Sequence, residues 1–226
     1  MLKQWQTIFF ICLANINVAV FAAEVNYLGI DYKYRIMHGD NTDTYQMRNV
    51  LPSNYNEGQV YYAHRFASGI GFDLTYEQSQ NKQQTHVFIN QQVFLGGQQN
   101  NGDVTVINNR IMAGQFNILG YANVNDNIEA LGQIGFSIMH ADMTGSITSG
   151  SVNYNLMPSK VYEFIPRVGF GLQYFFAKLG FGLRAIFAWE GTDWYRMKMT
   201  NDDGVRYTIK PFKESWCFGI GLVAKF

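Results

Sequence analysis

Apolar and polar residues alternate along most of the chain, which is the pattern of β-strands that present one apolar face. The final segment shows this period of two clearly, because apolar side chains from Trp216 to Phe226 occupy every second position and Gly219, Gly221 and Lys225 lie between them. The same alternation recurs along the preceding chain. It predicts an all-β protein of eight strands, at residues 26–36, 59–66, 69–77, 104–121, 128–138, 160–175, 178–190 and 216–226.

The connections between these strands alternate in length. Short turns are expected near 67–69, 123–126 and 176–177, and long polar segments at 37–57, 78–103, 140–157 and 191–206. Short turns on one side and long loops on the other are typical of an antiparallel up-and-down transmembrane β-barrel. With an even strand count, both chain ends lie on the short-turn, periplasmic side, and four long loops face outward.

One segment leaves the strand count open. Residues 84–95 have good strand propensity and precede a glycine-rich turn, so they predict that the third and fourth strands continue beyond the membrane. A ten-stranded barrel is the alternative, although it would break the alternation of loop lengths. In residues 104–121 the parity of Arg110 disagrees with that of Gln115 and Asn117, which predicts a β-bulge between them.

The first 22 residues read as an export signal. Lys3 is followed by an apolar run from Ile8 to Phe21, which is interrupted by Asn15 and Asn17. The alternative is a transmembrane anchor, but a helix needs about 20 apolar residues to span a bilayer. We therefore expect a cleaved signal peptide at residues 1–22 and a barrel domain at residues 23–226.

Alternation alone does not say which face is buried, and a soluble, lipocalin-like barrel would alternate in the same way. The apolar face is too bulky to fit inside a narrow barrel, and the opposite face is rich in glycine. Aromatic residues also gather where the two membrane interfaces are expected, as in an aromatic girdle. Those assigned to it are Trp189, Trp216, Tyr162, Phe66, Tyr121, Tyr174, Phe175 and Phe226.

The composition agrees with this architecture. Charged residues make up 15% of the chain and aromatic residues 16%, which suits a β-protein with a large apolar surface. The formal net charge is zero, so no basic field favours a nucleic acid as a partner. Cys217 is the single cysteine after the signal, which excludes an internal disulfide in the mature chain.

On these features the chain resembles the small outer-membrane β-barrels, namely the OmpA-like transmembrane domain, its OmpX-type relatives and porin-like outer membrane proteins. The resemblance rests on the export signal, the eight-strand alternation, the glycine-aromatic run from Arg167 to Tyr174 and the terminal strand. It implies a location in the cell outer membrane, with membrane lipid and the barrel-assembly machinery as partners. In that class a final aromatic residue such as Phe226 resembles the assembly signal.

The charged residues of the polar face are the main candidate site. In a narrow barrel they point into the lumen, where buried charges need partners, so a structural ion-pair network is expected. The alternative is that the same charges line a gated path for ions. The predicted members are Asp31, Lys33, Arg35, Arg65, Asp73, Glu77, Glu129, Glu163, Arg167, Arg184, Glu190 and Lys225.

No enzyme motif stands out. Ser137, His140 and Asp142 are close in sequence but have the wrong face relation for a triad, and no GxSxG is present. The four histidines have no metal-ligand spacing, and no cofactor is expected. Trp194 and Tyr195 in the last long loop are candidate contacts for host or surface ligands, and the alternative, which is slightly favoured, is that they belong to the interfacial aromatic belt. The sequence therefore favours a structural or surface-interaction protein, then a narrow solute channel, and last a lipid-modifying enzyme.

Overall fold

The computed structural model describes residues 23–38, 51–91, 99–157, 162–176, 180–192, 196–210 and 212–226. The predicted signal peptide at 1–22 lies outside these residues and stays a prediction. Among the residues that the structure describes, no helix is long and apolar enough to span a bilayer.

The described chain is all β. Its strands are β1 (Val25–His38), β2 (Asn54–Arg65), β3 (Ile70–Ser79), β4 (Gln84–Gln91), β5 (Asn100–Asn125), β6 (Ile128–Ser149), β7 (Val152–Met157), β8 (Glu163–Phe175), β9 (Phe181–Glu190), β10 (Met197–Asn201), β11 (Arg206–Ile209) and β12 (Glu214–Lys225). Eight of them, β1, β2, β3, β5, β6, β8, β9 and β12, pair antiparallel in chain order and close a ring when β12 pairs with β1. The predicted eight-stranded antiparallel barrel is confirmed, and the ten-stranded alternative is wrong.

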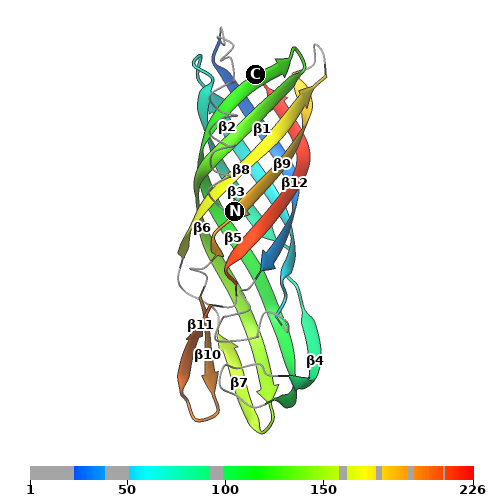
Figure 1. Ribbon diagram of the computed structural model, residues 1–226, viewed down its shortest axis with the longest axis vertical. Helices are drawn as coiled ribbons and strands as arrows, with labels where there is room; N and C mark the ends of the chain where they lie inside the picture. The colour runs from blue at the N-terminus through cyan, green and yellow to red at the C-terminus, as the bar shows by residue number, and fades with distance from the viewer. Residues whose placement is uncertain are drawn as a thin grey trace, which may run out of the picture.

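The two ends of the barrel differ. Tight connections join β2 to β3, β5 to β6 and β8 to β9 at one end, where the chain also terminates (Figure 1). At that end the backbones of Asn26 and Phe226 bond each other in both directions, at 2.9 and 3.0 Å. The long connections lie at the other end, so the predicted alternation of loop lengths is confirmed.

The described parts of the long connections contain strands. This agrees with the predicted continuation of strands at 84–95 and corrects the prediction of the other long connections as polar loops. β4 pairs with the outer part of β5, β7 with the outer part of β6, and β10 and β11 continue that sheet. Together with β5 and β6 they form an extension of six strands that projects beyond the ring (Figure 1). The sequence misled here because many outward positions in these segments are Asn, Thr or Gln, while the inward positions keep an apolar alternation.

The predicted bulge between Arg110 and Gln115 is also wrong. β5 pairs with β6 without interruption from Asn108 to Asn123, and its register shifts lie at Val106/Asn108 and Asn123/Asn125. Gln115 and Asn117 point inward, whereas Arg110 lies on the outer face opposite Asp142. Arg110 lies on the part of β5 that leads into the extension. A charged residue can occupy the outer face there, so the alternation continues through Arg110 without a bulge.

The ring carries its apolar face outward. Adjacent outward positions on every strand of the ring are occupied by large apolar side chains, of which Leu28, Ile30, Leu74, Ile134 and Ile220 are 52–64% exposed. The inward positions hold the charged residues of the ring together with buried apolar and aromatic residues such as Tyr61 and Leu131. An apolar outer surface on a closed ring satisfies all backbone groups while facing hydrocarbon, so the molecule is a transmembrane β-barrel of the outer-membrane type.

The extension has the opposite polarity. Its inner side holds a cluster of buried apolar residues, including Phe88, Val104, Val106, Ile147 and Met199, each at most 2% exposed. On its outer side, the outward positions of β7, β10 and β11 are mainly Asn, Thr, Lys and Arg, as expected of strands in water whose apolar face is covered. Val87 and Ile89 on β4 and Ile107 on β5 are exposed apolar residues of the extension.

Candidate functional site: a charged lumen beside a projecting sheet

The part of the lumen next to the extension holds a dense ion cluster. This cluster is called the upper cluster, with the middle and lower clusters following toward the chain termini, although Figure 1 draws the extension at the bottom. Arg35 on β1 contacts Glu57 at 2.6 Å and Glu77 at 2.6 Å, and it also bonds Glu190. Lys33, two residues earlier on the same inward face, contacts Glu57 at 3.1 Å and also bonds Glu77. All of these side chains are fully buried, so each charge depends on its partners for stabilisation.

Two further strands contribute to this upper cluster. Arg167 on β8 contacts the second carboxylate oxygen of Glu190 at 2.6 Å. The Ser215 hydroxyl on β12 accepts a bond from Arg35 at 3.0 Å. The cluster therefore ties β1 to β2, β3, β8, β9 and β12 across the barrel, and it occupies the lumen cross-section with three cations and three carboxylates.

The middle cluster is centred on Arg184 of β9. Its guanidinium lies 3.9 Å from Asp31 and 4.0 Å from Asp73, and 3.8 Å above the ring of Tyr61. Asn117 donates to Asp73 at 2.7 Å. One cation here faces two carboxylates, so the cluster carries a formal charge of −1.

The lower cluster is centred on Glu129 of β6. It pairs with Arg65 at 3.0 Å and Lys225 at 2.7 Å, and it accepts a bond from the Tyr27 hydroxyl at 2.8 Å. Tyr27 stacks on Tyr121 with ring centroids 5.4 Å apart. Two cations against one carboxylate give a charge of +1, which balances the middle cluster.

The described lumen charges thus cancel. Six cations face six carboxylates across the three clusters. Buried apolar and aromatic residues such as Tyr61, Leu131 and Val223 lie among the middle and lower clusters, and the buried apolar cluster of the extension lies beyond the upper cluster. Ion pairs packed among such side chains leave little room for a water-filled path in a barrel of eight strands.

Tyr121 and Phe175 correct the predicted aromatic girdle. They are 6% and 7% exposed and point into the lumen, whereas Phe226, Tyr162 and Tyr174 lie on the outer surface as predicted. The alternation explains the error, because Phe175 follows the outward Tyr174. Two adjacent aromatic residues on one strand cannot both face lipid.

The structure brings together eleven of the twelve predicted lumen charges. Glu163 is the exception, because it is half-buried at the start of β8 opposite Met139, beside the apolar interior of the extension. Glu57 was missed, because it fell in the predicted loop 37–57. Its parity with Gln59 and Tyr61 was the available signal, and in the structure it lies directly opposite Lys33.

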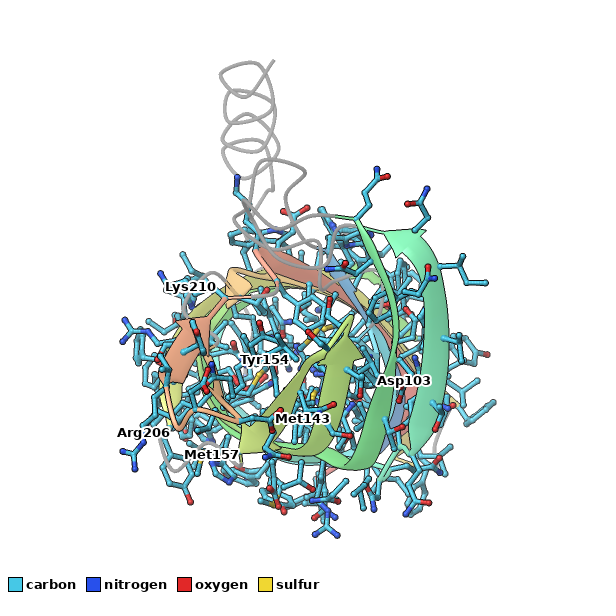
Figure 2. All side chains as sticks on the ribbon, turned by 90° about the horizontal axis from the view of Figure 1, so that it is seen from below. Asp103, Met143, Tyr154, Met157, Arg206 and Lys210 are labelled. Atoms are coloured by element: carbon cyan, nitrogen blue, oxygen red, sulfur yellow. The ribbon has the colours of Figure 1, made fainter. Side chains whose placement is uncertain are left out.

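One side of the extension carries four exposed cations within the described residues, next to the exposed Asp202 and Asp203 in the turn between β10 and β11. Lys198 and Arg206 are exposed on β10 and β11, with Arg196 and Lys210 beside them. Seen from the extension end, Arg206 and Lys210 lie at the outer rim of the sheet while Tyr154 and Met143 lie within it (Figure 2).

The other side of the extension ends in β4. Within the described residues β4 pairs with β5 alone, so its second backbone edge is open. The strand contains no Lys, Arg, Asp, Glu or Pro, and its outward Val87 and Ile89 are 67% and 73% exposed. Charges and proline are the usual protection of a strand edge against pairing with another chain, and β4 lacks both.

Other predicted chemistry is not assembled. Trp194 and Tyr195 lie outside the described residues. Ser137 is buried in the lumen, while His140 and Asp142 lie on the other face of β6. Cys217 is buried and unbridged, and the described residues contain no group of His, Cys, Asp and Glu placed to hold a metal ion.

Known structures with similar folds are outer-membrane β-barrels. Ail, the attachment invasion locus protein of Yersinia pestis, is 12% identical with a TM-score of 0.46, covering 90% of this chain and 97% of Ail. A major outer membrane protein from Thermus thermophilus is 8% identical with a TM-score of 0.46, over 88% and 99% of the two chains. The outer membrane protease OmpT from Escherichia coli is 8% identical with a TM-score of 0.38, over 90% and 97%. No protein-family model and no curated protein matches the chain.

Proposed function

We propose that the protein is a structural and surface-interaction protein of the outer membrane, in which a rigid barrel holds a β-sheet in contact with the outside of the cell. The observation that carries this is the reversal of polarity along the barrel. The ring is built for lipid, while the extension is built for water and projects beyond the lipid-facing surface. Such a sheet can contribute to envelope integrity, adhesion or host contact.

Two features of the extension are the contact sites in this proposal. The open edge of β4 can pair with an extended segment of another protein through backbone hydrogen bonds. The basic outer face around Lys198 and Arg206 can attract a polyanionic surface polymer, because clustered exposed cations raise the local potential. Both sites lie at the end of the molecule opposite the C-terminus (Figure 1).

Cell adhesion tests the proposal directly. Cells that express the protein should bind an epithelial monolayer several-fold better than cells that lack it. Ile89→Lys should reduce binding if the strand edge is the contact, and Lys198→Glu with Arg206→Glu should reduce it if the basic face is. Equal binding by expressing and non-expressing cells, with the protein confirmed at the surface, would contradict the function.

A narrow solute channel is the alternative, and conductance separates the two. We expect no steady conductance in planar bilayers, from either the natural chain or Arg167→Ala, because ion pairs and buried apolar side chains pack together in the narrow lumen. Ion-selective channels that Arg167→Ala abolishes would support the channel instead.

The proposal includes two further expectations. Phe226 and the alternating strand β12 present the features that an assembly machinery would read at the periplasmic end. The protein is also taken to be a non-enzyme, and the check is mass spectrometry of lipid A from cells with and without it. A new lipid A species that depends on the protein would make it a lipid-modifying enzyme.

A further inference from the structure

The lipid-facing surface of the ring contains a shallow, open groove. It has a volume of about 540 Å³ and lies mainly across β2, β3, β5 and β6, with Leu28 of β1 also in its lining. Its lining is almost wholly apolar and includes Leu74, Tyr76, Gly114, Phe116, Phe136 and Ile138.

The absence of a side chain at Gly114 makes the floor of the groove. Gly114 points outward on β5, and a Cβ atom placed there would meet no other atom within 4 Å. Its neighbours across the sheet are Tyr76 on β3 and Ile138 on β6. These side chains rise on either side of the glycine, so the backbone lies at the bottom of a trough.

Aromatic rings stiffen one wall of the trough. Phe116 and Phe136 lie opposite each other on β5 and β6, with ring centroids 5.9 Å apart, and Phe136 stacks on Phe164 at 4.6 Å. Rings held by their neighbours lose little freedom when a ligand packs against them, which lowers the entropic cost of binding.

The surroundings decide what can occupy the groove. Val60, Leu74 and Tyr76 at its rim are 49–52% exposed and belong to the apolar surface that faces hydrocarbon. A water-soluble ligand does not reach this depth, and the groove offers almost no polar group to hold one. The groove is continuous with the lipid interface, where acyl chains are the surrounding solvent.

We propose that this groove is a lipid-binding site that holds one acyl chain of a membrane phospholipid in slow exchange with the bulk lipid. The chain lies over Gly114, between Tyr76 on one side and Phe116 and Phe136 on the other. The surface of β12 gives the contrast, because its outward positions from Trp216 to Phe226 contain no glycine.

Lipid retention tests the site. The protein is refolded with palmitoyl-oleoyl phosphatidylethanolamine, delipidated stepwise in detergent, and its bound lipids are counted by native mass spectrometry. Gly114→Phe fills the groove, and Gly120→Phe is the matched control on the same face of β5, where a Cβ likewise meets nothing within 4 Å. We expect the natural chain and Gly120→Phe to retain one lipid and Gly114→Phe to lose at least four-fifths of it. Equal retention by all three proteins, or none by the natural chain, overturns the proposal.

A second measurement uses the unaltered protein, so it does not depend on the folding of a variant. A phosphatidylethanolamine with a photoreactive diazirine in its acyl chain is cross-linked to the barrel in vesicles. Adducts should be at least fivefold enriched on Tyr76, Phe116 and Phe136 over Ile220 and Leu222. An even distribution of adducts would show ordinary annular lipid. A dimer of the natural chain that Gly114→Phe dissociates would assign the groove to a second copy, and both results overturn the proposal.

Discussion

The ring and the extension use the same strand alternation with opposite results. In the ring, charges such as Arg35 and Glu190 point inward and apolar residues such as Ile220 point outward. In the extension, Phe88 and Ile147 point inward and Lys198 points outward. β5 and β6 run through both regions, so the polarity reverses along single continuous strands.

The reversal shows that the surrounding medium determines whether the inner face of the strands carries polar or apolar residues. In hydrocarbon there is no gain from burying apolar side chains, so the interior can be polar if its groups pair with one another. In water the hydrophobic effect returns and draws the apolar face inward. The same kind of substitution should therefore change stability differently in the ring and in the extension. Single variants in each region can test this difference.

The largest effect is expected at the upper ion cluster. Arg35→Ala leaves Glu57, Glu77 and Glu190 with too few cations, and breaking a buried ion pair costs about 3–5 kcal/mol. Urea unfolding in lipid vesicles should show the loss. Arg206→Ala, at an exposed arginine of the extension, is the control and should change the free energy of unfolding by about 0.5 kcal/mol at most. A similar midpoint for both variants would mean that the lumen charges are not the stabilising core of the ring.

The second effect is expected in the interior of the extension. Phe88→Ala removes a side chain that is 1% exposed, a change that costs about 3–5 kcal/mol in a packed core. Amide hydrogen exchange should accelerate in β4 and the outer part of β5, while the ring keeps its protection. The control is Val87→Ala, since the neighbouring side chain is 67% exposed. Uniform acceleration over the whole barrel would show that the two regions unfold as one unit.

The third prediction compares the same substitution, isoleucine to lysine, on the outer face of the ring and on the outer face of the extension. Ile220 and Ile107 are 62% and 61% exposed, but Ile220 lies in the lipid-facing ring and Ile107 in the extension. Ile220→Lys should cost about 2–4 kcal/mol, because a lysine near the bilayer midplane is desolvated. Ile107→Lys should stay within about 0.5 kcal/mol, because water surrounds that position. Equal effects on the urea midpoint would contradict the assignment of the two regions to two solvents.

The smallest effect is expected at the lower cluster. The Lys225 side chain is 33% exposed, and Glu129 keeps Arg65 and Tyr27 as partners when the lysine is removed. Lys225→Ala should therefore cost about 1 kcal/mol or less, in the range of partly solvated ion pairs. The urea midpoint would measure it beside Arg35→Ala. A loss as large as that of Arg35→Ala would mean that Lys225 is indispensable for holding the end of β12.

Most of the ring could be predicted from the sequence, because a period of two needs only local information. It assigned the inward charges correctly at Asp31, Arg35 and Glu190. The pattern fails at Glu57, because β2 begins earlier than its alternation indicates, and at Tyr121 and Phe175, whose aromatic rings suit a girdle although their parity is inward. In the extension, strand was predicted at 84–95. The parts that form β7, β10 and β11 were predicted as loops, because their outward residues are polar, although a strand in water also has polar residues on its outer face.

The sequence by itself determined that the chain forms alternating strands with long connections at one end, since the pleat of a β-strand sends successive side chains to opposite faces. The tertiary structure alone decided how the charges combine. Arg35 meets Glu190 across 155 positions of the chain, and Glu129 meets Tyr27 across 102, because ring closure through β12 and β1 brings these strands around one axis. The groove over Gly114 likewise exists only once four strands lie side by side. Periodicity is a property of one strand, whereas a lumen with paired charges and a surface groove are properties of the closed sheet.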